Sequence, residues 1–432
     1  MVLLYSSSST SRLQYICNFI FKELLNTDVA ITTDTIEFEN NTGVKINYSN
    51  REFSSSSFTL IPAALLFETD IKEQPIECFE TNSYKAFFKT IGNFSFDIFA
   101  ASFYLLSRYE EYLPHEKDMY GRYSHESSLA YKEEFLKLPL INIWVQDFAK
   151  NLRSKFSLFS FQFSPFTFIP TYDIDIAYAY KGKGLLKNIG GSVRSFFTFK
   201  FSAFSERIAV LAGIKKDPYD TFEWLDKLHK KYNLSPLYFF LVAEKNYLYD
   251  KNTLPHTKIM KQLIADHAKK YPIGIHPSWQ SGDDLSLLKK EISFLQEVSG
   301  KEIKECRRHY LRFNIPEGYY KLLDINMLSD HSMAYATVNG FRASIANSFY
   351  WYDLKNEKQT ALRVHPFCYM EANSLFEQKV SAEEAFTEMV YYANICKQVG
   401  GTMVTLWHNH MISSEKTYKG WAEAYEKFLA TL

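Results

Sequence analysis

The chain has 432 residues, of which 46% are hydrophobic and 17% aromatic, and its 49 basic side chains balance its 49 acidic ones. A chain of this length exceeds what one hydrophobic core usually serves, so we expect at least two domains. The lack of a basic excess argues against a nucleic-acid binder, since such proteins neutralise phosphates with Lys and Arg. The aromatic content suits a carbohydrate partner, because sugar rings stack on aromatic faces, and it suits a Phe-rich core equally well.

Cysteines and apolar runs bear on the cellular environment. The five cysteines are scattered and no two form a C-x-x-C pair, so we expect neither a disulfide framework nor a structural zinc knuckle. The first residues carry no signal-peptide pattern, and no apolar run is long enough to predict a membrane span. We therefore expect a soluble, cytoplasmic protein with reduced thiols. The sequence leaves its oligomeric state open.

The first 160 residues mix helical and strand-like patterns. The best-defined helix covers 11–25, where Leu13, Ile16, Ile20 and Leu24 fall on one stripe. The other expected elements are helices at 96–112 and 140–156 and strands at 29–32, 44–48 and 58–61. No cluster of metal-ligating residues and no nucleophile arrangement is found in this part of the sequence. We expect a smaller α+β domain at 1–160, whose role stays open.

A Ser- and Phe-rich stretch around Pro165 marks the expected domain boundary. Beyond it, apolar strands alternate with helices, which predicts an α/β domain at 166–432 with a parallel sheet or a (β/α) barrel. The expected strands are 166–176, 237–242, 273–276, 306–313, 362–367 and 403–408, and the expected helices are 221–232, 257–270, 285–298, 381–399 and 418–429. The Gly- and Phe-rich segment 181–216 fits neither pattern, so we interpret it as an insertion.

Two acidic residues stand at the end of the first strand of this domain. Side chains alternate along a strand, so Thr171, Asp173 and Asp175 share one face. Two carboxylates this close repel each other unless a cation lies between them. A divalent metal would serve, with one carboxylate as a ligand and the other holding a water molecule. The alternative is a solvated strand end or a helix cap, but Asp is depleted in strands, and this favours the metal site.

Later strands of the expected barrel also end in polar residues. The strand 273–276 stops at His276, directly before a proline, and the strand 403–408 stops at His408. In the strand 306–313, alternation would place Arg312 on one face and His309 on the other. An arginine on the site face could orient a catalytic carboxylate through a bidentate pair. Because the carboxyl ends of barrel strands form the mouth of the active site, we expect these residues to meet.

Residues 171–175, Thr-Tyr-Asp-Ile-Asp, resemble the T-F-D-D-G first motif of the polysaccharide deacetylase family (carbohydrate esterase family 4). The order of motifs is similar to that family over 166–432. The resemblance implies a distorted (β/α) barrel that uses a divalent metal, usually zinc, to hydrolyse N- or O-acetyl groups on sugars. It also implies a role for each matching residue, namely Asp173 as general base, Asp175 and His276 as metal ligands, Arg312 as the arginine that positions the base, and His408 as general acid.

Two positions depart from the family pattern. Gln280 stands where the second histidine of the H-x-x-x-H metal motif belongs, and Ile176 replaces the glycine that follows the second Asp of the first motif. The third metal ligand would then be water, Gln280 itself or another histidine such as His309. Two hypotheses follow. The protein is either a metal-dependent deacetylase acting on an amino sugar or polysaccharide, or an inactive deacetylase-like barrel that binds a glycan or another protein.

Overall fold

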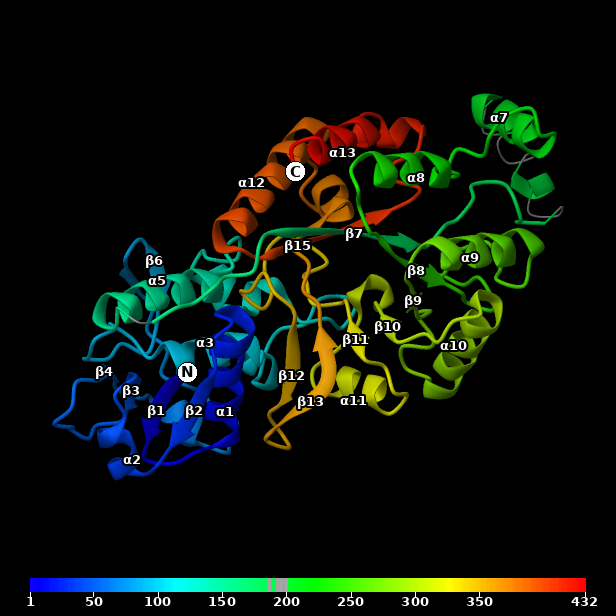
Figure 1. The fold of residues 1–432 in the computed structure, drawn as a ribbon. Helices are drawn as coiled ribbons and strands as arrows, with labels where there is room; N and C mark the ends of the chain where they lie inside the picture. Colours follow the sequence, from blue (N-terminus) through cyan, green and yellow to red (C-terminus); the bar gives the residue numbers. More distant parts are fainter. Residues whose placement is uncertain (158, 185–187, 192–196, 198–200) are drawn as a thin grey trace.

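The computed structural model describes residues 1–157, 159–184, 188–191, 197 and 201–432, and its helices and strands form an α/β protein (Figure 1). A four-stranded sheet lies in the first part of the chain, and a nine-stranded sheet in the second. A two-stranded antiparallel hairpin of β5 (Phe79–Thr81) and β6 (Tyr84–Ala86) belongs to the first part. The α/β class expected from the sequence is therefore confirmed.

The four-stranded sheet has the order β2-β1-β3-β4, and every pair of neighbours is parallel. Its strands are β1 (Val2–Ser6), β2 (Val29–Thr32), β3 (Val44–Tyr48) and β4 (Phe58–Leu60). Parallel neighbours need crossover connections. α1 (Ser11–Cys17), continued by a π-helix at Asn18–Leu24, joins β1 to β2. The sequence patterns did not indicate the buried central strand β1, and the α+β class expected for this part of the chain is not confirmed.

The helices that complete the first part pack on this sheet or beside it (Figure 1). They are α2 (Thr35–Asn40), α3 (Ile98–Leu106), α4 (Leu129–Lys132) and α5 (Leu140–Lys155). All nine residues of α3 are buried, and the Asp97 carboxylate caps the helix by accepting the amide hydrogens of Phe99 and Ala100. Apolar residues on every side make α3 a central core helix rather than a surface helix.

The nine-stranded sheet has the order β12-β13-β11-β10-β9-β8-β7-β15-β14. All its pairings are parallel except that of β12 with β13. The strands are β7 (Thr167–Ile174), β8 (Leu237–Leu241), β9 (Ile273–His276), β10 (Glu305–Cys306), β11 (Ser329–Asp330), β12 (Phe349–Asp353), β13 (Lys358–Val364), β14 (Tyr369–Met370) and β15 (Thr402–His408).

Helices connect these strands and cover the sheet (Figure 1). They are α7 (Phe201–Leu211), α8 (Phe222–Lys231), α9 (Lys258–Lys270), α10 (Leu285–Ser299), α11 (Glu317–Leu323), α12 (Ala382–Val399) and α13 (Trp421–Leu429). The capping box expected at the start of α12 is present, with Ser381 and Glu384 bonding each other's backbone. Part of the predicted insertion lies outside the described residues, and α7 belongs to the part that is described.

The nine-stranded sheet is wound like a (β/α) barrel without being closed. From β7 to β11 each strand pairs with the next in the chain, and β15 pairs with the free side of β7. Among the described residues, however, the edge strands β12 and β14 do not pair with each other. One edge is an antiparallel hairpin and the other a strand of two residues. The parallel winding agrees with the expectation, whereas the closed barrel is not confirmed.

The two parts of the chain share one hydrophobic core, which runs from β1 to α13. Polar contacts cross between them as well. Tyr15 donates a hydrogen bond of 2.6 Å to the carbonyl of Tyr350, and the Arg342 guanidinium pairs with Glu111 at 2.6 Å. The domain boundary near residue 160 stays a prediction. Over the residues that the structure describes, no helix is both long enough and apolar enough to traverse a bilayer.

Candidate metal centre

The candidate site lies where neighbouring parallel strands end. β7 carries Asp173 and is followed by Asp175, β9 ends at His276, and β15 ends at His408, which pairs in register with Asp173. The turn after β10 carries His309. Because these strands are neighbours and run in the same direction, their carboxyl ends gather five polar side chains at one edge of the sheet. This meeting of residues was expected from the sequence.

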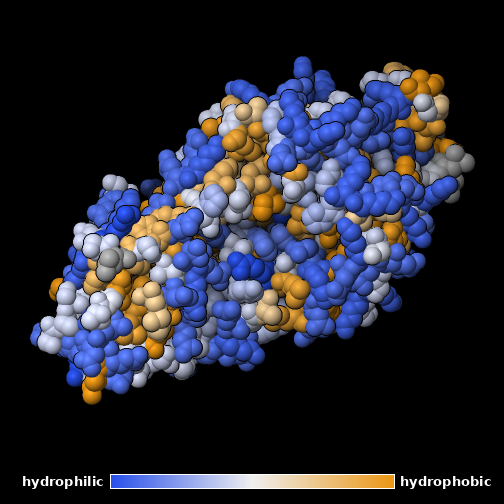
Figure 2. Space-filling model, in the orientation of Figure 1, coloured by the Kyte–Doolittle hydropathy of each residue, from blue (hydrophilic) through white to orange (hydrophobic). Residues whose placement is uncertain are grey.

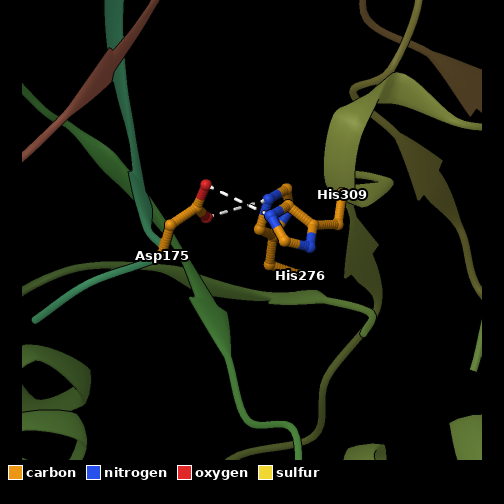
Figure 3. A group of neighbouring side chains, drawn as sticks. All are labelled: Asp175, His276 and His309. Atoms are coloured by element: carbon orange, nitrogen blue, oxygen red, sulfur yellow. Dashed lines mark ion pairs between the residues drawn. The ribbon is translucent and has the colours of Figure 1, made fainter. Parts of the chain in front are cut away.

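Three of these side chains converge on one point (Figure 3). The Nε2 atom of His276 lies 3.1 Å from Oδ1 of Asp175, and Nε2 of His309 lies 3.3 Å from Oδ2 of the same carboxylate. One ligand atom from each residue lies within 4.8 Å of the other two. Figure 3 shows both imidazole rings directed at the Asp175 carboxylate from across the site.

Hydrogen bonds of the Nδ1 atoms determine which ring nitrogen of His276 and His309 faces Asp175. Nδ1 of His276 lies 2.6 Å from the carbonyl oxygen of Arg307, and Nδ1 of His309 lies 3.0 Å from Oδ1 of Asp250. Carbonyl and carboxylate oxygens only accept hydrogen bonds, so each Nδ1 carries a proton and donates it. Both Nε2 atoms therefore face Asp175. Metal-ligating histidines are usually oriented in this way, with the far nitrogen donating to a carbonyl or carboxylate.

The electrostatics of the three residues call for positive charge between them. Burial by itself would raise the pKa of Asp175, yet the facing His309 and His276 rings hold that pKa well below its usual range. Burial would lower the pKa of His309, but Asp175 and Asp250 outweigh it and raise the pKa to about 9. Two imidazole nitrogens and a carboxylate oxygen are also a typical donor set for zinc, so the residues present fit such an ion.

Asp173 stands next to this trio and is held by an arginine. Its Oδ1 accepts a hydrogen bond of 2.9 Å from Nη1 of Arg307, and its Oδ2 lies 3.6 Å from Nε2 of His276. Arg307 is fully buried and also donates to Thr171 Oγ1 at 2.7 Å and to the His331 carbonyl at 2.9 Å. Several bonds thus hold the guanidinium, and through it the carboxylate of Asp173, in one position.

The arginine expected in this role, Arg312, lies elsewhere. β10 ends at Cys306, and a turn follows in which Tyr310 and Leu311 have positive φ values of 58° and 51°. The alternation predicted over 306–313 is therefore wrong, since that segment is not a strand. Arg312 Nη2 pairs at 2.7 Å with the exposed Asp283. Arg307 makes the contact with Asp173 that was expected of Arg312. The same turn brings His309 to the site.

His408 is oriented by a carboxylate that the sequence patterns did not indicate. Its Nδ1 lies 2.7 Å from Oε1 of Glu371, its backbone N–H donates to the same oxygen at 2.6 Å, and its Nε2 lies 3.5 Å from Asp175. Burial lowers the pKa of His408, but the charges of Glu371, Asp175 and Asp173 raise it to about 9. His408 can therefore carry a proton that faces the site. Glu371 directly follows β14 and is itself fully buried.

A cavity of about 390 Å³ opens above these residues. Its walls are aromatic and apolar as well as charged, and they include Tyr120, Arg122, Tyr249, Tyr310, Met370, Phe376, Leu406 and Met411. Tyr120 and Arg122 come from the first part of the chain, and Arg122 Nη1 donates to the carbonyl of Tyr310 at 2.7 Å. The first part thus supplies one wall of the cavity and supports the turn that carries His309. Gln280, the alternative ligand, is not part of this lining.

A second cluster that could hold a metal consists of Glu305, His331 and His365, with ligand atoms within 4.8 Å of one another. Nε2 of His331 lies 2.6 Å from Glu305. The two imidazole rings are stacked with centroids 4.4 Å apart and planes inclined by only 6°. A ligating nitrogen directs its lone pair along the ring plane, so one ion cannot lie in both of two parallel planes. This cluster fits a metal less well than the centre at Asp175.

Fold and site together define an α/β protein with a candidate metal centre of two histidines and one aspartate. A family of unknown function, DUF7033, matches residues 2–157. Comparison with curated proteins finds no match.

Among solved structures the chain is similar to proteins assigned as polysaccharide deacetylases. One from Mycobacterium smegmatis is 15% identical, with a TM-score of 0.39 over 62% of this chain and 84% of that one. Another from Pseudomonas aeruginosa is 11% identical, with a TM-score of 0.38 and the same coverage of 62% and 84%. A CE4 family pseudoenzyme from Bacillus anthracis is 9% identical, with a TM-score of 0.32 over 61% of this chain and 59% of that one.

Proposed function

We propose that this protein is a metal-dependent hydrolase that removes acetyl groups from an amino sugar or a polysaccharide. The observation that carries the proposal is the arrangement at one edge of the sheet. The trio of Asp175, His276 and His309 is flanked by a carboxylate held by Arg307 and by a histidine held by Glu371. Hydrolysis of an acyl group needs these three functions, namely an electrophilic centre, a base and an acid.

Asp175, His276 and His309 would hold the metal, and zinc suits this donor set best. When bound, a divalent cation would act as a Lewis acid on the acyl carbonyl and would make water acidic enough to attack it. Asp173 would accept the proton of the attacking water, with its carboxylate kept in position by Arg307. His408 would then protonate the departing amine or alcohol.

The walls of the cavity support a carbohydrate substrate. Tyr249 stacks on Trp279 with ring centroids 4.0 Å apart, and Tyr120 and Tyr310 lie edge-on or tilted beside them. Aromatic faces at the mouth of a polar site suit sugar rings, which present C–H groups on one face and hydroxyls at the edge. A cytoplasmic location, expected from the sequence, would make an intracellular glycan or its precursor the substrate.

One observation favours the alternative of a binding protein without turnover. Gln280 replaces the second histidine of the family's metal motif, so the ligand set depends on His309, which comes from a different part of the chain. If His309 does not serve as a ligand, the centre has only Asp175 and His276 and would hold a metal weakly. The cavity would then recognise a glycan or a protein without hydrolysing it.

Asp173→Asn distinguishes the two functions. The amide has the same shape as the carboxylate, and Asp173 Oδ2 lies 3.6 Å from Nε2 of His276, so the metal should be retained. Loss of the proton acceptor should lower the rate by about 10²–10⁴-fold. The measurement is acetate release from acetylated amino-sugar oligomers by zinc-loaded wild type and variant, with metal content determined for both. A wild type that holds zinc but releases no acetate from a broad panel of acetylated sugars would sink the hydrolase proposal.

A further inference from the structure

The predicted insertion at 181–216 differs in charge from the rest of the chain. It contains eight basic side chains and one acidic side chain, Glu206, in a protein whose formal net charge is zero. It is also rich in phenylalanine, with five in this short segment. A segment that combines a strong basic excess with aromatic residues is typical of surfaces that meet an anionic lipid interface.

One helix within this insertion, α7, turns its apolar side to the outside. At about 100° per residue, Phe201, Phe204, Ile208 and Leu211 fall within a stripe about 80° wide. Ile208 and Leu211 are 48% and 46% exposed, whereas the buried residue of the helix, Val210, lies on the opposite side. A helix on the surface of a globular protein ordinarily does the reverse and buries its apolar stripe.

The apolar stripe continues past the end of the helix, where Ile214 is 83% exposed. Figure 1 shows α7 standing at one end of the molecule, beyond the helices that cover the sheet, and Figure 2 shows hydrophobic residues gathered at that end. Lys215 and Lys216 follow directly, with side chains 53% and 50% exposed. Their ion pairs with Glu206 and Glu223 lie on the surface, where such pairs contribute little and exchange readily for other anions.

The insertion begins at the same edge of the sheet as the candidate metal centre. It follows Asp175 after only five residues, and the first of these, Ile176, lines the cavity. The amide of Asn409 holds the carbonyl of Ile176, and the side chain of Asn252 accepts from the amide of Ala177. The insertion therefore begins directly beside the cavity.

We infer that residues 201–216, formed by α7 and the residues directly after it, dock on the surface of an anionic phospholipid bilayer. The exposed apolar side chains of α7 and Ile214 enter the headgroup region, and Lys215 and Lys216 lie against the lipid phosphates. This contact does not require a helix that crosses the bilayer. The inference rests on the charge and exposure of the insertion, so it stands or falls independently of the hydrolase function.

The test is co-sedimentation of the full-length protein with vesicles of phosphatidylcholine alone or mixed with phosphatidylglycerol. Binding is expected to the mixed vesicles only, and to weaken as salt rises, because surface charges are screened. The triple variant Ile208→Ser, Leu211→Ser, Ile214→Ser should bind at least tenfold more weakly. Because these side chains are 46% exposed or more, the fold should survive, as checked by circular dichroism and thermal unfolding.

A matched control changes exposed isoleucines elsewhere. Ile36 and Ile91 are 70% and 91% exposed and lie in the first part of the chain, so Ile36→Ser with Ile91→Ser should leave vesicle binding unchanged. Three outcomes would overturn the inference. They are no binding to mixed vesicles, equal binding by the triple variant and the wild type, or a dimer in light scattering that the triple variant converts to a monomer. The last would make the stripe an interface between two copies.

Discussion

Arg307 and Asp173, which lie far apart in the chain, form a fully buried ion pair in which Nη1 of the arginine lies 2.9 Å from Oδ1 of the aspartate. The guanidinium also lies over the ring of Phe239, with 4.4 Å between its central carbon and the ring centroid. Arg307 thus connects Asp173, the proposed base on β7, with the turn after β10. That turn also carries His309. The position of the Asp173 carboxylate therefore depends on this one side chain.

The first prediction compares the two arginines. Arg307→Lys should lower kcat by tenfold or more, because an ammonium cannot bond Thr171, Asp173 and the His331 carbonyl together. Arg312→Lys should leave kcat near the wild-type value, since Arg312 pairs with the exposed Asp283. Acetate release and metal content are measured for both variants. A larger loss of kcat for Arg312→Lys than for Arg307→Lys would return Arg312 to the role expected from the sequence.

The second prediction concerns the metal ligands. Asp175→Ala, His276→Ala and His309→Ala should each abolish stoichiometric zinc binding, because each removes one of three converging donors. Gln280→Ala is the matched control and should retain zinc, since Gln280 does not line the cavity. Asp250→Asn should weaken zinc binding by about 10–100-fold, as is usual when an outer partner of a ligating histidine is changed. Full zinc content in His309→Ala, or its loss in Gln280→Ala, would identify a different third ligand.

The third prediction concerns stability in acid. Burial alone would raise the pKa of Glu111, but Arg342 and Arg108 lower it from 4.5 to about 2. Because this pKa is depressed in the folded state, the stabilisation is complete above pH 4.5 and is lost as the pH falls towards 2. At about 1.4 kcal/mol per pKa unit it amounts to on the order of 3 kcal/mol.

Denaturant unfolding of wild type and Glu111→Gln between pH 7 and pH 2.5 checks this. The variant should be less stable at pH 7 by about 3–5 kcal/mol, because the buried Arg342 loses its carboxylate partner and Arg108 keeps only Glu110. Its stability should fall less steeply in acid. Glu383→Gln, in which an exposed carboxylate is neutralised, should follow the wild type. Parallel pH profiles for Glu111→Gln and the wild type would contradict the assignment.

The fourth prediction concerns removal of residues 1–160. The change of sequence pattern near Pro165 indicates that the remainder folds alone. The contacts indicate otherwise, because the deletion would expose part of a shared core and leave Arg342 without Glu111. We expect fragment 161–432 to be insoluble or to unfold without a cooperative transition. Arg342→Leu in the fragment should recover part of its solubility, because it removes the charge that the deletion leaves unpaired. A soluble fragment that unfolds cooperatively would show that residues 161–432 fold as an independent domain.

Local patterns in the sequence predicted many elements and most members of the site. The strand that ends at His276 and the capping box before α12 were found as expected, because both depend on a few consecutive residues. Asp173 and Asp175 were expected together at the end of a strand, and they lie at the end of β7. Alternation and strand ends are properties of the chain itself, so these features could be predicted without a partner segment.

The choice between Arg307 and Arg312 could not be made in this way. Arg307 and Arg312 belong to one basic stretch, and the predicted alternation of its side chains assumed that this stretch was an extended strand. Tyr310 and Leu311 instead adopt positive φ values, which are uncommon for residues other than glycine. Contacts of the turn stabilise this conformation, among them the hydrogen bond from Arg122 to the carbonyl of Tyr310. A residue of the first part of the chain thus stabilises a turn that local sequence disfavours.

Glu371, Asp250 and Arg122 show where prediction from the sequence ends. None belongs to a motif, and each contacts the site from a segment distant in the chain. By itself, the sequence determined that Asp173, His276 and His408 stand near the ends of strands, because that follows from the period of each of these strands. Only the tertiary structure decided which side chains orient them, because a hydrogen-bond partner of a buried histidine is selected by packing between segments and not by spacing along one of them.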